Sequence, residues 1–333
     1  MYATASSARF RLRWRHWAPR VGIGLLALLA ICAIWLYSRL YGSLPQLDGA
    51  AVLAGLSAPV TVERDALGIP LIRGANRLDV ARATGFVHAQ ERFFQMDLLR
   101  RTATGELAAL FGPAALDLDR AHRLHRFRHR ARQALTAVPT EDRALIDAYT
   151  AGVNAGLAAL AAPPFEYLLL RIAPEPWRTE DTPLAVYAMY LNLQDQQWPR
   201  ESTHGLLHDQ LPPTLADFLD PLGTEWDAPL RGEALPSPPI PGPEVFDLRR
   251  QPVVDIVPPD PRTSQPPAFA LFPPVPTDES EAVSGSNNWA VAGQLTAHGG
   301  ALLANDMHLA MRVPDIWYRA SLLYPDERGH EWR

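Results

Sequence analysis

The stretch VSGSNNWAVAG, Val283 to Gly293, decides how the chain is interpreted. It places Gly285 and Ser286 directly before the apolar run NNWAVAG, which is typical of a short strand. Gly-Ser dipeptides are common in turns, so one interpretation is a turn that opens a strand. The other is a self-cleavage site, after which Ser286 is a new N-terminus and a nucleophile.

The second interpretation rests on how a serine is activated. A serine hydroxyl needs a base, and an N-terminal residue carries one in its own α-amine, whose ordinary pKa is about 7.7–8.0. Ser286 acquires a free amine if its hydroxyl attacks the preceding carbonyl and the resulting ester is hydrolysed. Gly285 favours this attack, because glycine tolerates unusual backbone angles and does not crowd the carbonyl.

A proline-rich segment, residues 235–285, precedes this stretch. It holds 14 of the 32 prolines of the chain, between Pro236 and Pro276. Proline at this density prevents helices and central strands, so the segment is interpreted as an exposed linker or a removable spacer. An exposed segment just before the bond also suits self-cleavage, because a new chain end must be free to move away.

The periodicity of the chain changes across this segment. Residues 39–234 are predicted to be mainly helical, with one or two helices over Asn76–Gly112 and a β-hairpin over Val60–Gly74. Residues 286–333 contain short apolar runs separated by turns, which predict a β-meander. The expected fold class is therefore α+β.

The N-terminus has the pattern of an export signal. A basic flank, residues 1–20, precedes an apolar segment, residues 21–38, in which Val21 to Tyr37 form a run of about 17 apolar residues. That length is at the short end for a membrane-spanning helix, and the basic flank places its start on the cytoplasmic side. An uncleaved signal anchor is favoured over a cleaved signal peptide, so the chain is expected at the inner membrane facing the periplasm, or exported to the periplasm.

Composition excludes other classes of protein. The formal net charge of -5 argues against a nucleic-acid partner. The single cysteine, Cys32, forms no internal disulfide and indicates nothing about the redox compartment.

Four blocks, taken together, resemble the penicillin acylase family of N-terminal-nucleophile hydrolases. Gly285, Ser286, Asn287 and Trp289 match the pattern of that family around its nucleophile. The other blocks are ERDALGIPLIRG (63–74), ATGFVHAQERFFQMDLLRRTATGELAALFG (83–112) and NDMHLAMRVPDIWY (305–318). The four follow the order of the family over about residues 55–324, which is more specific than any one of them.

The resemblance implies a precursor with the αββα sandwich of these hydrolases, incomplete here. It would be cut between Gly285 and Ser286 into an α-chain, a spacer and a β-chain, which form an α/β heterodimer. Its substrates would be small N-acyl amides, such as β-lactam side-chain amides or acyl-homoserine lactones, and its catalysis would need no cofactor.

The resemblance also assigns roles to single residues. Asn287 and Trp289 would position the nucleophile, and His308, 22 residues after Ser286, would assist processing and acyl transfer. Glu201 would contribute to a structural calcium site, whose remaining ligands would lie beyond residue 333. The alternatives are a loop histidine at 308 and a solvated glutamate in the first turn of a helix at 201.

The family's oxyanion hole would also lie beyond residue 333, so the 333-residue chain by itself is expected not to hydrolyse substrate. Two alternatives to the acylase precursor stay open. One is a truncated, catalytically inactive acylase-like protein. The other is a membrane-anchored periplasmic binding or scaffold domain, in which Gly285 and Ser286 form only a turn.

Two further groups of residues have structural interpretations. His122, His125 and His129 have a spacing that would share one helix face, but the arginines around them oppose a metal ion and favour a solvated basic helix. Arg100 and Arg101 are predicted to pair with Asp or Glu.

Overall fold

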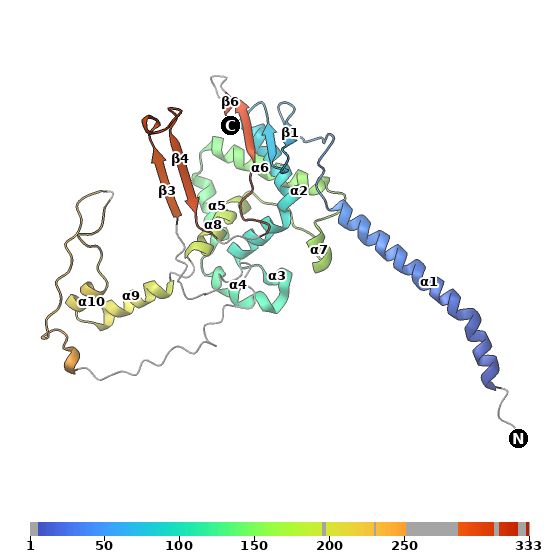
Figure 1. Ribbon diagram of the computed structural model, residues 1–333, viewed down its shortest axis with the longest axis horizontal. Coiled ribbons are helices and arrows are strands. Elements are labelled where there is room, and N and C mark those ends of the chain that lie inside the picture. Colours follow the sequence, from blue (N-terminus) through green and yellow to red (C-terminus); the bar gives the residue numbers. More distant parts are fainter. Residues whose placement is uncertain are drawn as a thin grey trace. The chain divides into compact units, whose positions relative to one another are not determined.

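The computed structural model describes residues 6–194, 198–229, 231–250, 286–309, 313–325 and 331–332 (Figure 1). It divides into two compact units, residues 1–186 with 311–333, and residues 187–310. The described residues are mainly helical with two small sheets, so the α+β class is confirmed.

The helices follow one another along the first two thirds of the chain. They are α1 (Ser6–Gly42), α2 (Arg77–Thr104), α3 (Ala108–Phe111), α4 (Leu116–Arg123), α5 (Phe127–Ala137), α6 (Thr140–Ala159), α7 (Phe165–Leu170), α8 (Asp181–Gln194), α9 (Trp198–Gln210) and α10 (Pro213–Leu219). Short 3-10 turns are η1 (Gly112–Ala115), η3 (Leu248–Arg250) and η4 (Gly293–Leu295). The strands are β1 (Thr61–Arg64), β2 (Pro70–Arg73), β3 (Ser286–Val291), β4 (Leu302–Met307), β5 (Ser321–Pro325) and β6 (Glu331–Trp332).

Helix α2 has a capped start and a defined end. The Asn76 side chain accepts a hydrogen bond from the Asp79 N–H at 2.9 Å, which satisfies one donor of the first turn. Gly105 ends the helix in the left-handed conformation, at φ 67°, where glycine has no Cβ penalty. The predicted helical stretch 76–112 is therefore one long helix followed by the single turn of α3.

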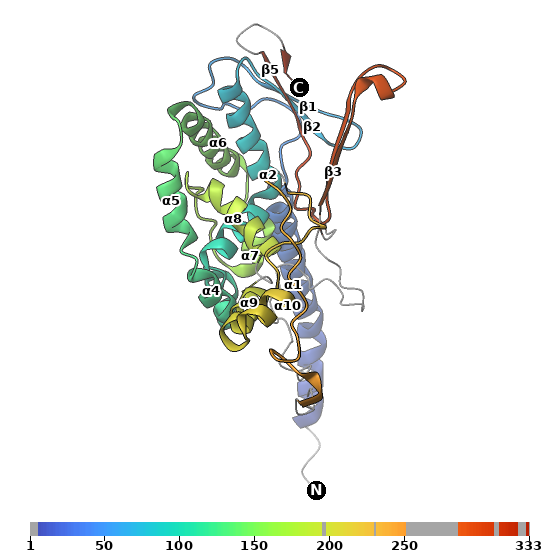
Figure 2. The same cartoon turned by 90° about the vertical axis from the view of Figure 1, so that its left-hand side faces the viewer.

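Helices α2 and α6 run side by side with their backbones in close approach (Figures 1 and 2). A Cβ built on Gly152 of α6 would lie 1.9 Å from the Arg82 carbonyl oxygen of α2. A Cβ on Gly85 of α2 would lie 2.2 Å from the Tyr149 carbonyl oxygen of α6. Only glycine fits at either position, so these residues set how closely the two helices pack.

A buried apolar and aromatic cluster fills the space beside this helix pair. Phe93 of α2, Val153 of α6 and Tyr167 of α7 are almost fully buried, together with Trp177. Burying such side chains contributes about 1.5–3 kcal/mol each, which makes this cluster a main source of stability in its unit.

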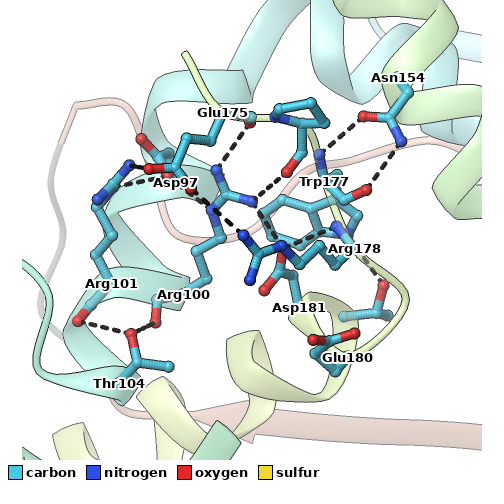
Figure 3. A network of polar contacts seen from close by, with 12 residues as sticks. Asp97, Arg100, Arg101, Thr104, Asn154, Glu175, Trp177, Arg178, Glu180 and Asp181 are labelled. Atoms are coloured by element: carbon cyan, nitrogen blue, oxygen red, sulfur yellow. Dashed lines mark hydrogen bonds and ion pairs between the residues drawn. The ribbon is translucent and has the colours of Figure 1, made fainter. Parts of the chain in front are cut away.

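A network of buried charges lies next to the cluster (Figure 3). The Asp97 carboxylate is fully buried and accepts from Arg100 Nε at 2.7 Å, Arg101 Nε at 3.0 Å and Tyr167 Oη at 2.7 Å. The predicted pairing of Arg100 and Arg101 with acidic residues is confirmed. Burial and the Asp97 charge raise the pKa of the Tyr167 hydroxyl, which therefore stays protonated and donates.

Asp181, the first residue of α8, is the second buried carboxylate of this network. It accepts from Arg100 Nη1 at 2.7 Å, Arg128 Nη1 at 2.8 Å and the Arg178 N–H at 2.8 Å. The network thereby connects α2, α5 and the start of α8 through charges that are all paired, which is the condition for burying them.

One sheet has the order β1-β2-β5-β6. The β1–β2 pair is antiparallel, so the hairpin predicted over Val60–Gly74 is confirmed. The β-meander predicted over residues 286–333 is wrong, because β4 and β5 belong to different sheets in the described part of the chain. The pairs β3–β4 and β5–β6 are each antiparallel, but β5 pairs in parallel with β2. The reason is long-range burial, since Leu323 of β5 and Ile72 of β2 are both buried in the same sheet.

The N-terminal helix matches the predicted export segment. Its part from Arg20 to Gly42 is long and apolar enough to cross a membrane, with mean hydropathy 2.3, and none of it is buried. A signal sequence near the N-terminus has the same properties. Residues 251–285, which include most of the proline-rich segment, lie outside the described residues.

Candidate functional site

The candidate nucleophile lies at the first residue of an antiparallel hairpin formed by β3 and β4. The register pairs Ser286 with Met307 and Asn287 with Asp306. Because residues directly opposite each other share a face of the sheet, Asn287 and Asp306 lie on one face, and Ser286 and Met307 lie on the other. His308 follows Met307 directly, so the hairpin brings it to the end of the sheet where Ser286 lies.

The loop between the strands is fixed by its own polar contacts. The Thr296 hydroxyl lies 2.9 Å from the Gly293 carbonyl and 2.8 Å from the Gly300 carbonyl, so one side chain spans the loop. A Cβ on Gly293 would lie 2.2 Å from the Gly299 carbonyl oxygen, so glycine is required there. This loop sets the register that places His308 near the start of β3.

His308 contacts two polar side chains across the end of the hairpin. Its Nε2 lies 3.2 Å from Asp306 Oδ2 and 3.4 Å from Asn287 Nδ2. One nitrogen cannot donate to the carboxylate and accept from an amide N–H at the same time. Two arrangements satisfy this restriction. In one, Nε2–H donates to Asp306 and the Asn287 side chain turns its amide oxygen toward the ring; in the other, Nε2 carries no proton and accepts from the Asn287 amide N–H. A proton on Nε2 therefore selects the contact with Asp306.

Ser286 is exposed at the start of β3. In the described part of the chain no hydrogen bond joins its hydroxyl to His308, because His308 bonds to side chains on the other face. Gly285 lies outside the described residues, so the bond between Gly285 and Ser286 has no described geometry. The arrangement therefore brings Ser286 and His308 to the same end of one hairpin without joining them.

The other nucleophile-block residue, Trp289, pairs with Ala304 and is 52% exposed. By the alternation of the strand it lies on the face of Asn287. Its indole therefore has an exposed apolar surface within this unit, and its positioning role stays a prediction.

Glu201 lies in the first turn of α9 and is exposed. Among the described residues no group of three histidine, cysteine, aspartate or glutamate side chains is arranged to hold a metal ion. The calcium role of Glu201 stays a prediction.

The three histidines at 122, 125 and 129 do not share one helix, because α4 ends at Arg123 and α5 begins at Phe127. The expectation of a solvated basic helix is wrong for His122, which is buried with Nδ1 2.7 Å from the Thr102 carbonyl. Arg126, in the left-handed conformation at φ 54°, makes the break.

Two further residues with polar contacts were not singled out from the sequence. Asp306 is two residues before His308 in a strand, and the period of two could have found it. The Tyr318 hydroxyl donates to Glu91 Oε2 at 2.7 Å. The two residues are far apart in the sequence, so no local pattern predicts this contact.

Comparisons with known proteins agree with the blocks described above. Residues 59–330 match the model of the family described as Penicillin amidase. The chain is 36% identical over 279 residues to penicillin acylase 2 proenzyme of Pseudomonas sp. (strain SE83), covering 84% of this chain and 34% of that protein. It is 31% identical over 320 residues to acyl-homoserine lactone acylase QuiP of Pseudomonas aeruginosa, covering 92% of this chain and 35% of that protein.

Among solved structures, thermostable penicillin G acylase from Alcaligenes faecalis aligns with 54% of this chain and 98% of its own chain, at 25% identity and a TM-score of 0.42. The chain spans about a third of the length of the curated relatives it matches.

Proposed function

The chain belongs to the penicillin amidase family, and from this premise we propose that it is part of an exported acylase precursor whose nucleophile is Ser286. The observation that carries the proposal is the block Gly285–Trp289, whose described residues from Ser286 onward lie in the hairpin strand β3 inside the family match. The reaction is hydrolysis of a linear amide through an acyl-enzyme.

The first step is proposed to be the precursor's own cleavage. The Ser286 hydroxyl attacks the Gly285 carbonyl carbon, the C–N bond breaks, and the amine of Ser286 takes a proton, leaving an ester. Water then hydrolyses the ester, so Gly285 ends in a carboxylate and Ser286 has a free hydroxyl and a free α-amine. The exposure of Ser286 supports this step, because water and a departing chain end both need room.

The second step is acyl transfer with the same oxygen. The α-amine takes the hydroxyl proton as Ser286 attacks the substrate carbonyl, and that proton then goes to the leaving amine. Water attacks the ester and releases the acid. We propose that His308 holds a proton near this centre and that Asn287 and Asp306 orient its ring, in accordance with the contacts of Nε2.

Contacts that join residues before 285 to residues after 286 support an α/β heterodimer. Strand β5 pairs with β2, and the Gly74 N–H donates to the Leu323 carbonyl at 3.0 Å. The Tyr318 hydroxyl donates to Glu91 at 2.7 Å. These contacts do not need the intervening segment, so they persist after it is cut.

The proposed substrates are N-acyl compounds with a small amine or lactone amine. The names of the two relatives point to β-lactam side-chain amides and acyl-homoserine lactones. The apolar helix α1 supports export, with an anchor in the inner membrane as the proposed arrangement. Calcium at Glu201 is proposed only as a structural ion.

Purification of the full chain and a denaturing gel test the cut. We expect two pieces, with the smaller one beginning Ser-Asn-Asn-Trp by N-terminal sequencing. Ser286→Ala should stay whole, and Ser286→Cys should still cleave because a thiol can replace the hydroxyl. Ser284→Ala is the matched control, since it removes the neighbouring serine and should cleave normally.

An uncut chain under all conditions would favour the scaffold alternative. Cleavage without hydrolysis in a protein of the full length of its relatives would favour the inactive acylase-like alternative. We expect the 333-residue chain by itself to release no amine from either substrate class, and release that is lost in Ser286→Ala would contradict this.

A further inference from the structure

A pocket of about 460 Å³ is lined by residues of α7 and the segment after it and by Arg39 near the C-terminal end of α1. Figure 1 shows α7 close to that end of α1. Arg39 of α1 lines one side, and Phe165, Leu168 and Arg171 line the other. Apart from the two arginines, every residue that lines the pocket is apolar or aromatic. The pocket therefore combines two cations with an apolar wall, and neither proposed catalytic step uses it.

Among the residues that the structure describes, no carboxylate pairs with the two charges of the pocket. No carboxylate lines it, and Glu166 of α7 bonds to Gln95 instead. Within the described ranges, neither Arg39 nor Arg171 has an ion-pair partner. Arg39 is half-buried, and a partly desolvated cation favours an anion beside it.

The pocket lies at a defined depth relative to the apolar helix. The 17 apolar residues Val21–Tyr37 span about 25 Å, close to the hydrocarbon thickness of a bilayer, so Arg39 reaches the headgroup region. The Ala162 N–H donates to the Gly42 carbonyl at 2.8 Å, which fixes the chain just before α7 to the end of α1. Helix α7 therefore begins at headgroup depth as well.

Exposed side chains on α7 and on the last turns of α1 suit an interface between lipid and water. Phe165 and Leu169, one turn apart on α7, are 45% and 74% exposed, while Tyr167 between them is buried in the core. Tyr37 and Tyr41 stack on each other with ring centroids 5.9 Å apart and are both exposed. Aromatic rings and arginines with apolar stems are the side chains that membrane interfaces favour.

We propose that this pocket binds an anionic phospholipid of the membrane that α1 spans. Arg39 and Arg171 hold the headgroup phosphate, and Phe165 and Leu169 lie against the acyl chains. Helix α7, in addition to α1, thereby attaches the folded unit to the bilayer. This rests on the proposed membrane anchor and is independent of the acylase chemistry.

The test uses the full chain in detergent micelles, with Ser286→Ala to keep it whole. Cys32→Ala removes the native thiol, and Leu169→Cys carries a polarity-sensitive dye. The protein is titrated with phosphatidylglycerol or with phosphatidylcholine. Because each arginine near an anionic surface contributes about fivefold, we expect the dye to respond to phosphatidylglycerol at about thirtyfold lower concentration.

Matched variants assign that preference to the pocket. The double variant Arg39→Gln with Arg171→Gln should abolish the preference for phosphatidylglycerol. Arg171→Gln alone should reduce the preference about fivefold. Because Arg171 is exposed, the single variant should fold, so it tests the pocket even if the double variant unfolds. Arg249→Gln with Arg250→Gln makes the same change of net charge at exposed residues and should leave the preference unchanged.

Three results would overturn the proposal. One is an equal response to both lipids. Another is a preference that survives Arg171→Gln and the double variant. The third is an equal response to soluble glycerol phosphate, which would make the pocket a site for free phosphate. A dye at Leu124→Cys, a residue that is 82% exposed and lies outside α1 and α7, should respond to neither lipid and not to glycerol phosphate.

Discussion

The β3–β4 hairpin exposes its polar side chains, whereas polar side chains beside the α2–α6 helix pair are buried. In the hairpin, the polar residues with a proposed role are exposed, with the His308 and Asp306 side chains 46% and 67% accessible. Beside α2, the carboxylates of Asp97 and Asp181 are fully buried and each accepts three hydrogen bonds. The proposed chemistry therefore lies on a hairpin whose polar contacts contribute little to stability, while the stability of the other unit depends on its charges.

The largest expected effect is the loss of one buried carboxylate. Asp181→Asn removes the charge that pairs with buried Arg100 and half-buried Arg128. Arg100 then keeps Asp97, and Arg128 keeps Glu106 and the more distant Glu180. We expect the free energy of unfolding of the helical unit to fall by about 3–5 kcal/mol. Thermal unfolding of the full chain in micelles measures it.

The matched control is Asp117→Asn. Asp117 pairs with Arg120 through side chains that are 91% and 74% exposed, so its loss should change stability by at most about 1 kcal/mol. Equal effects of the two variants would contradict the role given to burial.

A second prediction concerns the pH dependence of stability in the helical unit. Burial and the charge of Arg92 lower the pKa of His88 to about 4, below its ordinary value of 6.5. Between pH 6.5 and 4 the unfolded chain binds a proton that the folded chain does not, so stability falls as pH falls. The loss from His88 should reach up to about 3 kcal/mol at pH 4.

His88→Gln isolates this contribution from the carboxylates that also titrate in acid. His88 Nδ1 lies 2.9 Å from the Tyr149 hydroxyl, and its ring packs on Tyr318 with centroids 4.4 Å apart. Glutamine can keep a hydrogen bond there without gaining charge. The difference in stability between the two proteins should narrow from pH 6.5 to pH 4, and a constant difference would refute the assignment.

The hairpin was more predictable from sequence than the helical core. Gly285–Trp289 is contiguous, and the apolar run NNWAVAG predicted the strand β3, which spans Ser286–Val291. The pairing of β5 with β2 was not predictable, because a short apolar run does not specify its partner. The acidic partners of Arg100 could be expected, but not that one of them is Asp181, which lies on another helix.

A third prediction concerns the contact between α2 and α6. Gly152→Ala places a methyl group against the Arg82 carbonyl, at 1.9 Å if nothing moves, so the helices must separate. We expect a loss of about 1–3 kcal/mol, measured by denaturant unfolding. Gly205→Ala in α9 is the control, since its Cβ meets nothing within 4 Å and alanine should stabilise that helix by up to about 1 kcal/mol.

The smallest expected effect belongs to the proposed nucleophile itself. Ser286 is exposed, and the contacts of His308 in the described residues go to Asn287 and Asp306, so Ser286→Ala removes no packing and leaves no buried group unpaired. We expect its thermal unfolding to match that of the uncut parent within about 0.5 kcal/mol. Because processing would alter the parent, Gly285→Pro, which should block the cut, supplies an uncut reference that keeps Ser286. A larger loss in Ser286→Ala would mean that the serine supports the fold, and the turn interpretation would then explain the block better than the chemistry does.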